Sequence, residues 1–140
     1  SGVYVKPDEI GKGFWAGCAD DLGRPFSLDV TPEKSFYEFN IRPILTEYLP
    51  QFESARIANK LAGLYAYNTI DGNPYVFEKY GLIIISGCSG SGIMKADAIG
   101  RIVDALYRRK EEAELYDNAK FRVSDLGVEK RNVENEEFTI

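Results

Sequence analysis

The sequence predicts a small α+β fold, a mostly antiparallel sheet with two main helices. Short β-prone runs meet at turns that contain glycine or proline, which is typical of hairpins. Two longer stretches repeat apolar residues with the helical period. The chain has 140 residues, which is enough for one compact core.

A hairpin is predicted first. Val3–Val5 and Phe14–Cys18 are β-prone and flank a turn that contains Gly11 and Gly13. Together with Gly17 these glycines could be mistaken for a dinucleotide-binding fingerprint, but that motif must open a helix, and none follows here. In the loop after the hairpin, three carboxylates are interpreted as solvated turn residues rather than cation ligands: Asp20, Asp21 and Asp29.

The first helix is predicted to start at Pro32, with Thr31 as its N-cap. Pro43 lies inside the helical stretch and predicts a kink or break near residues 40–42. Pro50 ends the helix. Its predicted apolar face consists of Tyr37, Ile41, Ile44, Leu45 and Tyr48.

Three strands are predicted in the middle of the chain. Residues 55–67 form the first, and a tight turn at Asp71–Pro74 precedes the second, at Tyr75–Phe77. Gly81–Ser86 is a continuous apolar run, which predicts a strand buried on both faces in the centre of a sheet.

The second helix is predicted after Gly92, and a short strand at Phe121–Val123 follows it. Positive side chains at residues 108–110 suit the carboxyl end of that helix. Its predicted apolar face consists of Ile99, Ile102, Val103, Leu106 and Tyr107.

The composition excludes several classes of function. The chain has no histidine and two cysteines, so histidine-based catalysis and thiolate metal cages are ruled out and no metal site is predicted. The formal net charge of -5, with basic residues scattered along the chain, argues against binding to nucleic acid. The chain has no apolar run that could span a membrane, and a cytoplasmic location is predicted.

The segment Gly87–Gly92 follows the apolar strand and precedes the second helix. Such a turn gathers backbone N–H groups at the positive end of a helix dipole, where they stabilise negative charge. The glycine spacing differs from that of a P-loop, and Lys95 is not followed by the hydroxyl residue of that motif. On local grounds alone, an ordinary tight connection explains the turn equally well.

Two segments in fixed order resemble one known family. Residues 63–74 contain a Gly-x-x-x-x-x-Thr-x-Asp-Gly-x-Pro pattern, and residues 87–100 read GCSGSGIMKADAIG. Together with the apolar strand between them, they resemble the C-terminal part of FAD-dependent oxidoreductases of the D-amino-acid oxidase and sarcosine oxidase type. The resemblance is specific over residues 61–107 and weaker over residues 3–50.

The resemblance implies that the chain is a C-terminal fragment of a longer parent. Residues 1–77 would be the C-terminal part of the substrate-binding domain. Residues 78–140 would be the C-terminal strand, flavin-facing turn, helix and tail of the FAD-binding domain. The partner would be the N-terminal FAD-binding part of the same parent chain. Because both sets of elements would lack their partners, we expect the isolated fragment to expose apolar surface, which predicts homo-oligomers or partial disorder.

The family also assigns residues. The cofactor-binding positions it implies are Gly87, Cys88, Ser89, Gly90, Ser91, Gly92, Ile93 and Met94, and the substrate-binding positions are Tyr65, Tyr67 and Ser91. Ser91 replaces the usual histidine of the motif. Met94, rather than Lys95, matches the position of a substrate-facing lysine in some members. Gly63 matches the site of a covalent flavin link in certain sarcosine oxidases, so FAD is expected to be non-covalent.

Tyr65 matches a carboxylate-binding arginine in some amino-acid oxidases and a tyrosine in sarcosine-oxidase-like members. A tyrosine offers one hydrogen bond where arginine offers two, which makes a D-amino-acid or glycine oxidase less favoured. Without the family, Tyr65 and Tyr67 would be interpreted as side chains of one core face.

The resemblance therefore implies an enzyme that oxidises a secondary or tertiary amine or an amino acid, of the sarcosine kind, by hydride transfer to FAD. No catalytic residue is assigned. Two alternatives stay open: a flavin dehydrogenase of the glycerol phosphate type, and a non-catalytic α+β module that binds another protein.

Overall fold

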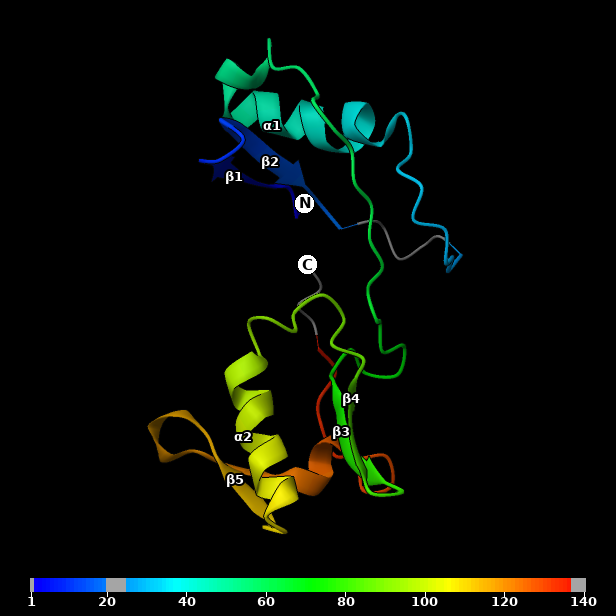
Figure 1. Ribbon diagram of the computed structural model, residues 1–140, viewed down its shortest axis with the longest axis vertical. Coiled ribbons are helices and arrows are strands. Elements are labelled where there is room, and N and C mark those ends of the chain that lie inside the picture. The colour runs from blue at the N-terminus through cyan, green and yellow to red at the C-terminus, as the bar shows by residue number, and fades with distance from the viewer. Residues whose placement is uncertain (1, 20–24, 137–140) are drawn as a thin grey trace. The chain divides into compact units, whose positions relative to one another are not determined.

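The computed structural model describes residues 2–19 and 25–136, so Asp20 and Asp21 lie outside the described residues. These residues form an α+β fold of antiparallel two-stranded sheets and helices. Two compact units divide the chain, the first ending at Leu64 and the second starting at Tyr65 (Figure 1). Each unit is described by itself.

Unit 1 opens with the predicted hairpin. Strand β1 (Tyr4–Asp8) pairs antiparallel with β2 (Gly13–Gly17), with Tyr4 opposite Gly17. The Asp8 carboxylate accepts a hydrogen bond from the Gly11 N–H at 3.0 Å and so closes the turn. The hairpin prediction is confirmed.

The helical part of unit 1 starts later than predicted. A π-helical turn, η1 (Tyr37–Ile41), leads into α1 (Arg42–Tyr48), and a 3-10 turn, η2 (Pro50–Phe52), follows. The predicted start at Pro32 with Thr31 as N-cap is wrong, because the Thr31 N–H donates to the Asp29 carboxylate at 2.8 Å and makes a local turn instead. The predicted break is confirmed, since the helix changes type between Ile41 and Arg42. Ile41 and Leu45 are buried.

The predicted strand over residues 55–67 is wrong. This segment has no regular secondary structure, and its large side chains are mostly exposed, including Ile57, Leu61 and Leu64. A strand needs a neighbour that completes its ladder of hydrogen bonds, and the described part of the chain provides none here.

Unit 2 is built on a second hairpin. Strand β3 (Tyr75–Lys79) pairs antiparallel with β4 (Leu82–Ser86) through a two-residue turn at Tyr80 and Gly81, both with positive φ. The prediction that β4 is a central strand buried on both faces is wrong. Among the described residues β4 pairs with β3 alone, and both Leu82 and Ile85 are exposed.

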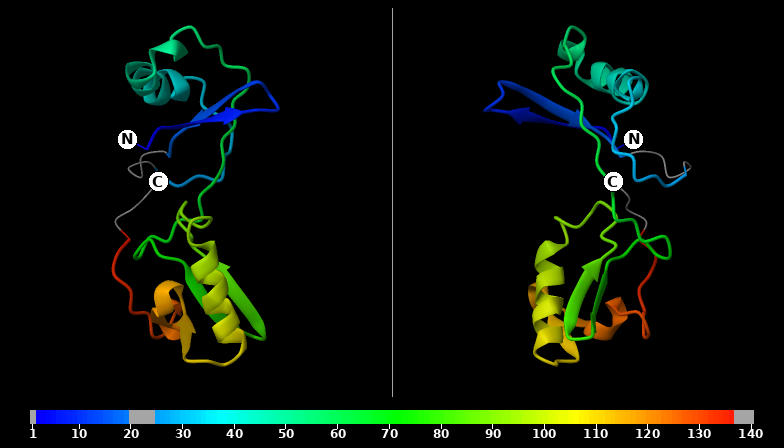
Figure 2. Two further views of the ribbon diagram at one scale, coloured as in Figure 1. Left: turned by 90° about the vertical axis from the view of Figure 1, so that its left-hand side faces the viewer. Right: turned by 45° about the vertical axis from the view of Figure 1, so that its right-hand side comes forward.

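Helix α2 (Ala96–Tyr107) packs against this hairpin, as both views in Figure 2 show. After it come β5 (Glu112–Glu114), the 3-10 turn η3 (Tyr116–Asn118), β6 (Lys120–Arg122) and the 3-10 turn η4 (Val123–Leu126). The short strand near Phe121 is confirmed, whereas β5, its partner, was not predicted. The core of unit 2 consists of Val76, Ile99, Ile102, Ala105, Ala113, Val123 and Leu126.

The predicted apolar face of α2 is confirmed for Ile99 and Ile102, which are buried, while Tyr107 at its end is exposed. No helix among residues 2–19 and 25–136 has the length and apolar character to cross a membrane.

Candidate functional site

The turn between β4 and α2 reverses the chain through left-handed backbone conformations. Gly87, Ser89 and Gly90 have φ values of +69°, +49° and +86°. A Cβ at Gly87 would lie 3.1 Å from the Asn68 Cβ, so both backbone angle and space favour glycine there. The glycines predicted to shape this connection therefore do so.

Backbone amides in the turn divide into two groups. The Ser89 N–H donates to the Ala66 carbonyl at 3.1 Å, and the Ser91 N–H donates to the Cys88 carbonyl at 3.0 Å. Between Gly90 and Met94, within the part of the chain that the structure describes, four N–H groups have no acceptor: those of Gly90, Gly92, Ile93 and Met94. These four donors are available to a hydrogen-bond acceptor from outside the turn.

Side chains around these donors leave the turn open on one side. Ile93 is 93% exposed and Met94 is also exposed. The Tyr65 ring lies against Gly90, where an added Cβ would be 3.3 Å from the ring. A glycine at 90 thus lets an aromatic ring pack directly on the backbone beside the free N–H groups.

Ser91 and Cys88 form the inner side of the turn. Ser91 is buried, and its hydroxyl donates to the Cys88 carbonyl at 3.1 Å. A Cβ at Gly92 would approach the Cys88 Cβ to 2.9 Å, so glycine is required opposite this half-buried cysteine. The Ser91 hydroxyl, predicted to contact substrate, is therefore engaged within the turn.

Residues 68–73 of unit 2 form a hydrogen-bonded segment that contacts the turn through Ser89. The buried Ser89 hydroxyl accepts the Asn68 backbone N–H at 2.9 Å and donates to the Gly87 carbonyl at 3.2 Å. The Asn68 side chain donates to the Asp71 carboxylate at 2.9 Å and to the Asn73 carbonyl at 2.6 Å. The turn is thereby tied to residues 68–73.

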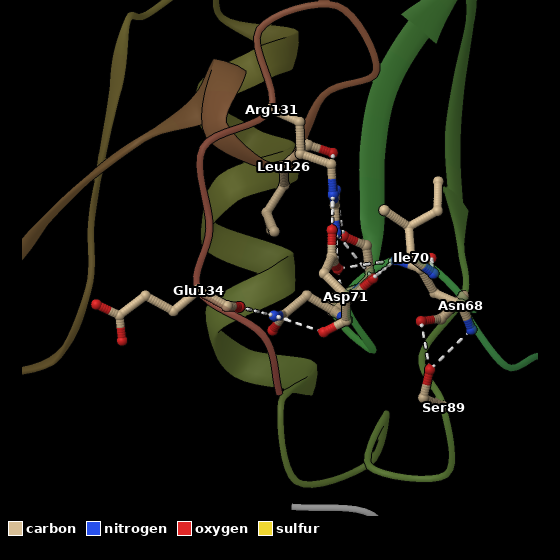
Figure 3. A network of polar contacts seen from close by, with 10 residues as sticks. Asn68, Ile70, Asp71, Ser89, Leu126, Arg131 and Glu134 are labelled. Carbon is tan, nitrogen blue, oxygen red and sulfur yellow. Dashed lines mark hydrogen bonds and ion pairs between the residues drawn. The ribbon is translucent and has the colours of Figure 1, made fainter. Parts of the chain in front are cut away.

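Arg131 completes this network from the C-terminal tail (Figure 3). Its guanidinium forms a two-point ion pair with Asp71, and it donates to the carbonyls of Pro74 and Leu126, each at 3.2 Å. It also stacks 4.1 Å from the centre of the Tyr75 ring. The Arg131 hydrogen bonds hold the pKa of the Asp71 carboxyl below its usual value, so Asp71 is an ionised structural anchor, in agreement with its predicted role as a turn former.

The tail makes two further contacts near the turn. Lys95, just before α2, forms an ion pair with Glu136. The Asn73 side chain donates to the Glu134 carbonyl at 2.8 Å. These tail residues were not singled out from the sequence, because nothing in their local pattern indicates a partner some 60 residues away in the chain, such as Asp71 for Arg131.

The structure brings most of the predicted site residues together. Tyr65 contacts the turn, and Tyr67 lies between Ala66 and Asn68, which both bond to Ser89. Tyr67 itself is half-buried. In the described part of the chain no three cysteine, aspartate or glutamate side chains are arranged to hold a metal ion.

Comparisons with known proteins agree on one family. The sequence profile described as "DAO: FAD dependent oxidoreductase" matches residues 1–106. The chain is 30% identical over 110 residues to "FAD-dependent oxidoreductase domain-containing protein 1" of Mus musculus, covering 74% of this chain and 22% of that protein. It is 26% identical over 132 residues to the homolog in Drosophila melanogaster, covering 90% of this chain and 23% of that protein.

The chain thus spans about a fifth of the length of the curated relatives it matches. The matched region includes both the first hairpin and the turn at Gly87–Gly92.

Proposed function

Since the chain belongs to the DAO family of FAD-dependent oxidoreductases, we propose that it supplies the flavin-facing edge of the active site in a longer flavoprotein. That flavoprotein oxidises a secondary or tertiary amine, or an amino acid, of the sarcosine kind. The part that binds the FAD pyrophosphate is the partner of this chain and lies in the same longer polypeptide. The chain's share of its relatives' length supports this division.

The four free N–H groups at Gly90, Gly92, Ile93 and Met94 carry the proposal. A flavin ring presents carbonyl oxygens and ring nitrogens along one edge, and these are acceptors for such donors. The turn fits a flavin edge because its four N–H donors are unpaired and the side chains of Ile93 and Met94 are exposed. Glycine at 90 adds no side chain over the backbone there, and the Tyr65 ring packs against it.

FAD held at this turn would supply an acceptor for the hydride on the carbon next to the amine nitrogen. The backbone donors of the turn would hold the edge of the ring, and fixed donors stabilise negative charge that develops there without rearrangement. The start of α2 directly after the turn adds the positive end of a helix dipole. This chain needs no acid or base for that role.

Tyr65 stands where sarcosine-oxidase-like members carry a tyrosine, and this correspondence supports an amine of the sarcosine kind. Tyr65 is exposed and offers one hydroxyl to a substrate. Lys95 is engaged by Glu136, so its charge is already balanced. A substrate carboxylate would therefore find a single hydrogen bond here rather than a two-point arginine contact.

Four further expectations belong to the proposal. FAD is held non-covalently, since Gly63 offers no side chain for a link. Two cysteines are too few for a disulfide framework, which supports a cytoplasmic location. The division of the parent's domains near Phe77 and self-association of the isolated chain stay predictions. The exposed apolar side chains of β4 support the latter.

The test uses the longer flavoprotein reconstituted with FAD. Anaerobic bleaching of the flavin absorbance is followed with sarcosine, dimethylglycine, proline and glycerol phosphate. We expect bleaching with at least one amine. Bleaching with glycerol phosphate alone would instead support the glycerol phosphate type of dehydrogenase, and a protein that binds no FAD would contradict the proposal.

A Tyr65→Phe variant tests the substrate contact. Loss of one hydrogen bond should raise KM for the amine several-fold while kcat changes little. The matched control is Tyr80→Phe, because Tyr80 is an exposed tyrosine in the β3–β4 turn. Equal effects of the two variants would remove Tyr65 from the substrate site.

A further inference from the structure

We propose that Ser89 is a positioning residue, whose hydroxyl fixes the turn in the conformation that aims its free N–H groups at the flavin edge. This inference rests on the proposed function and names a residue that controls it. It is carried by the backbone angle, the burial and the hydrogen bonds of Ser89.

The backbone angle shows that serine is not the sterically easy choice. Ser89 has a φ of +49°, in the left-handed region where a side chain is disfavoured relative to glycine. The flanking Gly87 and Gly90 also have positive φ and are glycines. A glycine at 89 would adopt this φ without steric strain. The serine hydroxyl must therefore contribute an interaction that offsets the strain.

What it supplies is a set of buried hydrogen bonds. Ser89 is 3% exposed, and its hydroxyl both accepts the Asn68 N–H and donates to the Gly87 carbonyl. Its own N–H reaches the Ala66 carbonyl on the same segment. Ser89 therefore makes two hydrogen bonds that join the turn to residues 66–68, and a third, to the Gly87 carbonyl, within the turn.

The hydrogen bonds of Ser89 lie directly before the free N–H donors in the chain. Gly90 follows Ser89 in the chain, and Asn68 on the other side is held by Asp71, which Arg131 anchors in turn. Without the Ser89 hydroxyl, the Asn68 N–H loses its acceptor in a buried place, and the turn loses its link to this anchored segment. The donors at 90–94 would then sample more orientations.

Two variants separate the hydroxyl from the backbone angle. Ser89→Ala removes the hydroxyl and keeps the crowding, whereas Ser89→Gly removes the hydroxyl and relieves the crowding. If Ser89 acts only through its backbone angle, Ser89→Gly behaves like the unmodified protein. If the hydroxyl is the active feature, both variants are impaired. The control is Ile102→Val, a core change in α2 away from the turn.

The first measurement needs no FAD. Hydrogen exchange of the Asn68 amide is followed by NMR in the 140-residue chain. We expect the Asn68 amide to exchange at least tenfold faster in both Ser89 variants than in Ile102→Val. Each variant is measured at the same interval below its own melting temperature, so that differences in overall stability cancel. Unchanged exchange in Ser89→Gly would overturn the inference that the hydroxyl holds the turn.

The second measurement is the midpoint potential of FAD in the longer flavoprotein. Poorly aimed donors stabilise the reduced, negatively charged ring less, so the potential should fall in both Ser89 variants and stay unchanged in Ile102→Val. A tenfold loss of preference for the reduced form equals about 30 mV for a two-electron couple. If FAD binds and its potential is unchanged in the Ser89 variants, the positioning role is overturned. If the unmodified protein does not bind FAD, the proposed function is overturned. The exchange measurement needs no FAD, so it tests the role of the hydroxyl in either case.

Discussion

Replacing Arg131 by methionine should destabilise unit 2 strongly. The side chains of Arg131 and Asp71 are 12% and 7% exposed, so the variant leaves a buried carboxylate without its counter-ion. Breaking a buried ion pair by removing one partner costs about 3–5 kcal/mol. Two donors to Asp71 remain, from the Asn68 side chain and the Asn73 N–H, so we expect the lower end, about 3 kcal/mol.

Hydrogen exchange of the Ile102 amide measures this loss, because Ile102 lies in the interior of α2 and its side chain belongs to the core of unit 2. A loss of about 3 kcal/mol corresponds to roughly a hundredfold faster exchange, since 1.36 kcal/mol is a factor of ten. The matched control is Arg101→Met, which removes an exposed ion pair with Asp97 one helical turn away and should change little.

The double variant Asp71→Asn with Arg131→Met adds a second check. It removes both charges, so it should be less destabilised than Arg131→Met alone. The reasoning is refuted if Arg131→Met and Arg101→Met exchange at the same rate, or if the double variant loses as much as the two single variants summed.

Three further predictions concern unit 2. Because the folded-state pKa of Asp71 is lowered, its stabilisation is complete above about pH 4 and is lost as pH falls through that lowered pKa; urea unfolding of Asp71→Asn between about pH 5 and 2 should show a flatter decline. Gly90→Ala should lose about 1–2 kcal/mol from its φ of +86°, and more than Gly81→Ala, which has a similar φ but open space around it; thermal melts compare the two. Val76→Ala should cost about 2 kcal/mol in chemical unfolding because Val76 is 1% exposed, and a cost under about 0.5 kcal/mol would contradict its place in the core.

Local sequence patterns predict those helices and strands whose stabilising interactions lie within one short segment. The first hairpin, strand β3 and helix α2 follow from turn residues and apolar spacing within one short segment. The wrong helix start comes from a local turn between Asp29 and Thr31, whereas the errors at residues 55–67 and at β4 concern segments whose state depends on distant partners. An apolar run such as that of β4 predicts a buried strand, but only neighbouring strands decide whether it is covered, and the described residues provide one.

The candidate site divides in the same way. Its glycines and the strand-to-helix order predicted where backbone donors gather. Which donors are free could not be predicted, since the Ser89 and Ser91 amides are paired through the three-dimensional path of the turn. The anchoring role of Arg131 was also beyond reach, because an arginine in a polar tail is most often solvated and only its position beside Asp71 shows otherwise.

The chain has one tryptophan, Trp15, and it lies in strand β2 of unit 1. Intrinsic indole fluorescence therefore originates wholly outside the unit that carries the glycine turn. A denaturation curve recorded from that emission reports the first hairpin directly, and it reports melting around Ser89 only where the two units unfold together. Conversely, a tryptophan placed at the exposed Ile93 would give the turn an optical reporter of its own.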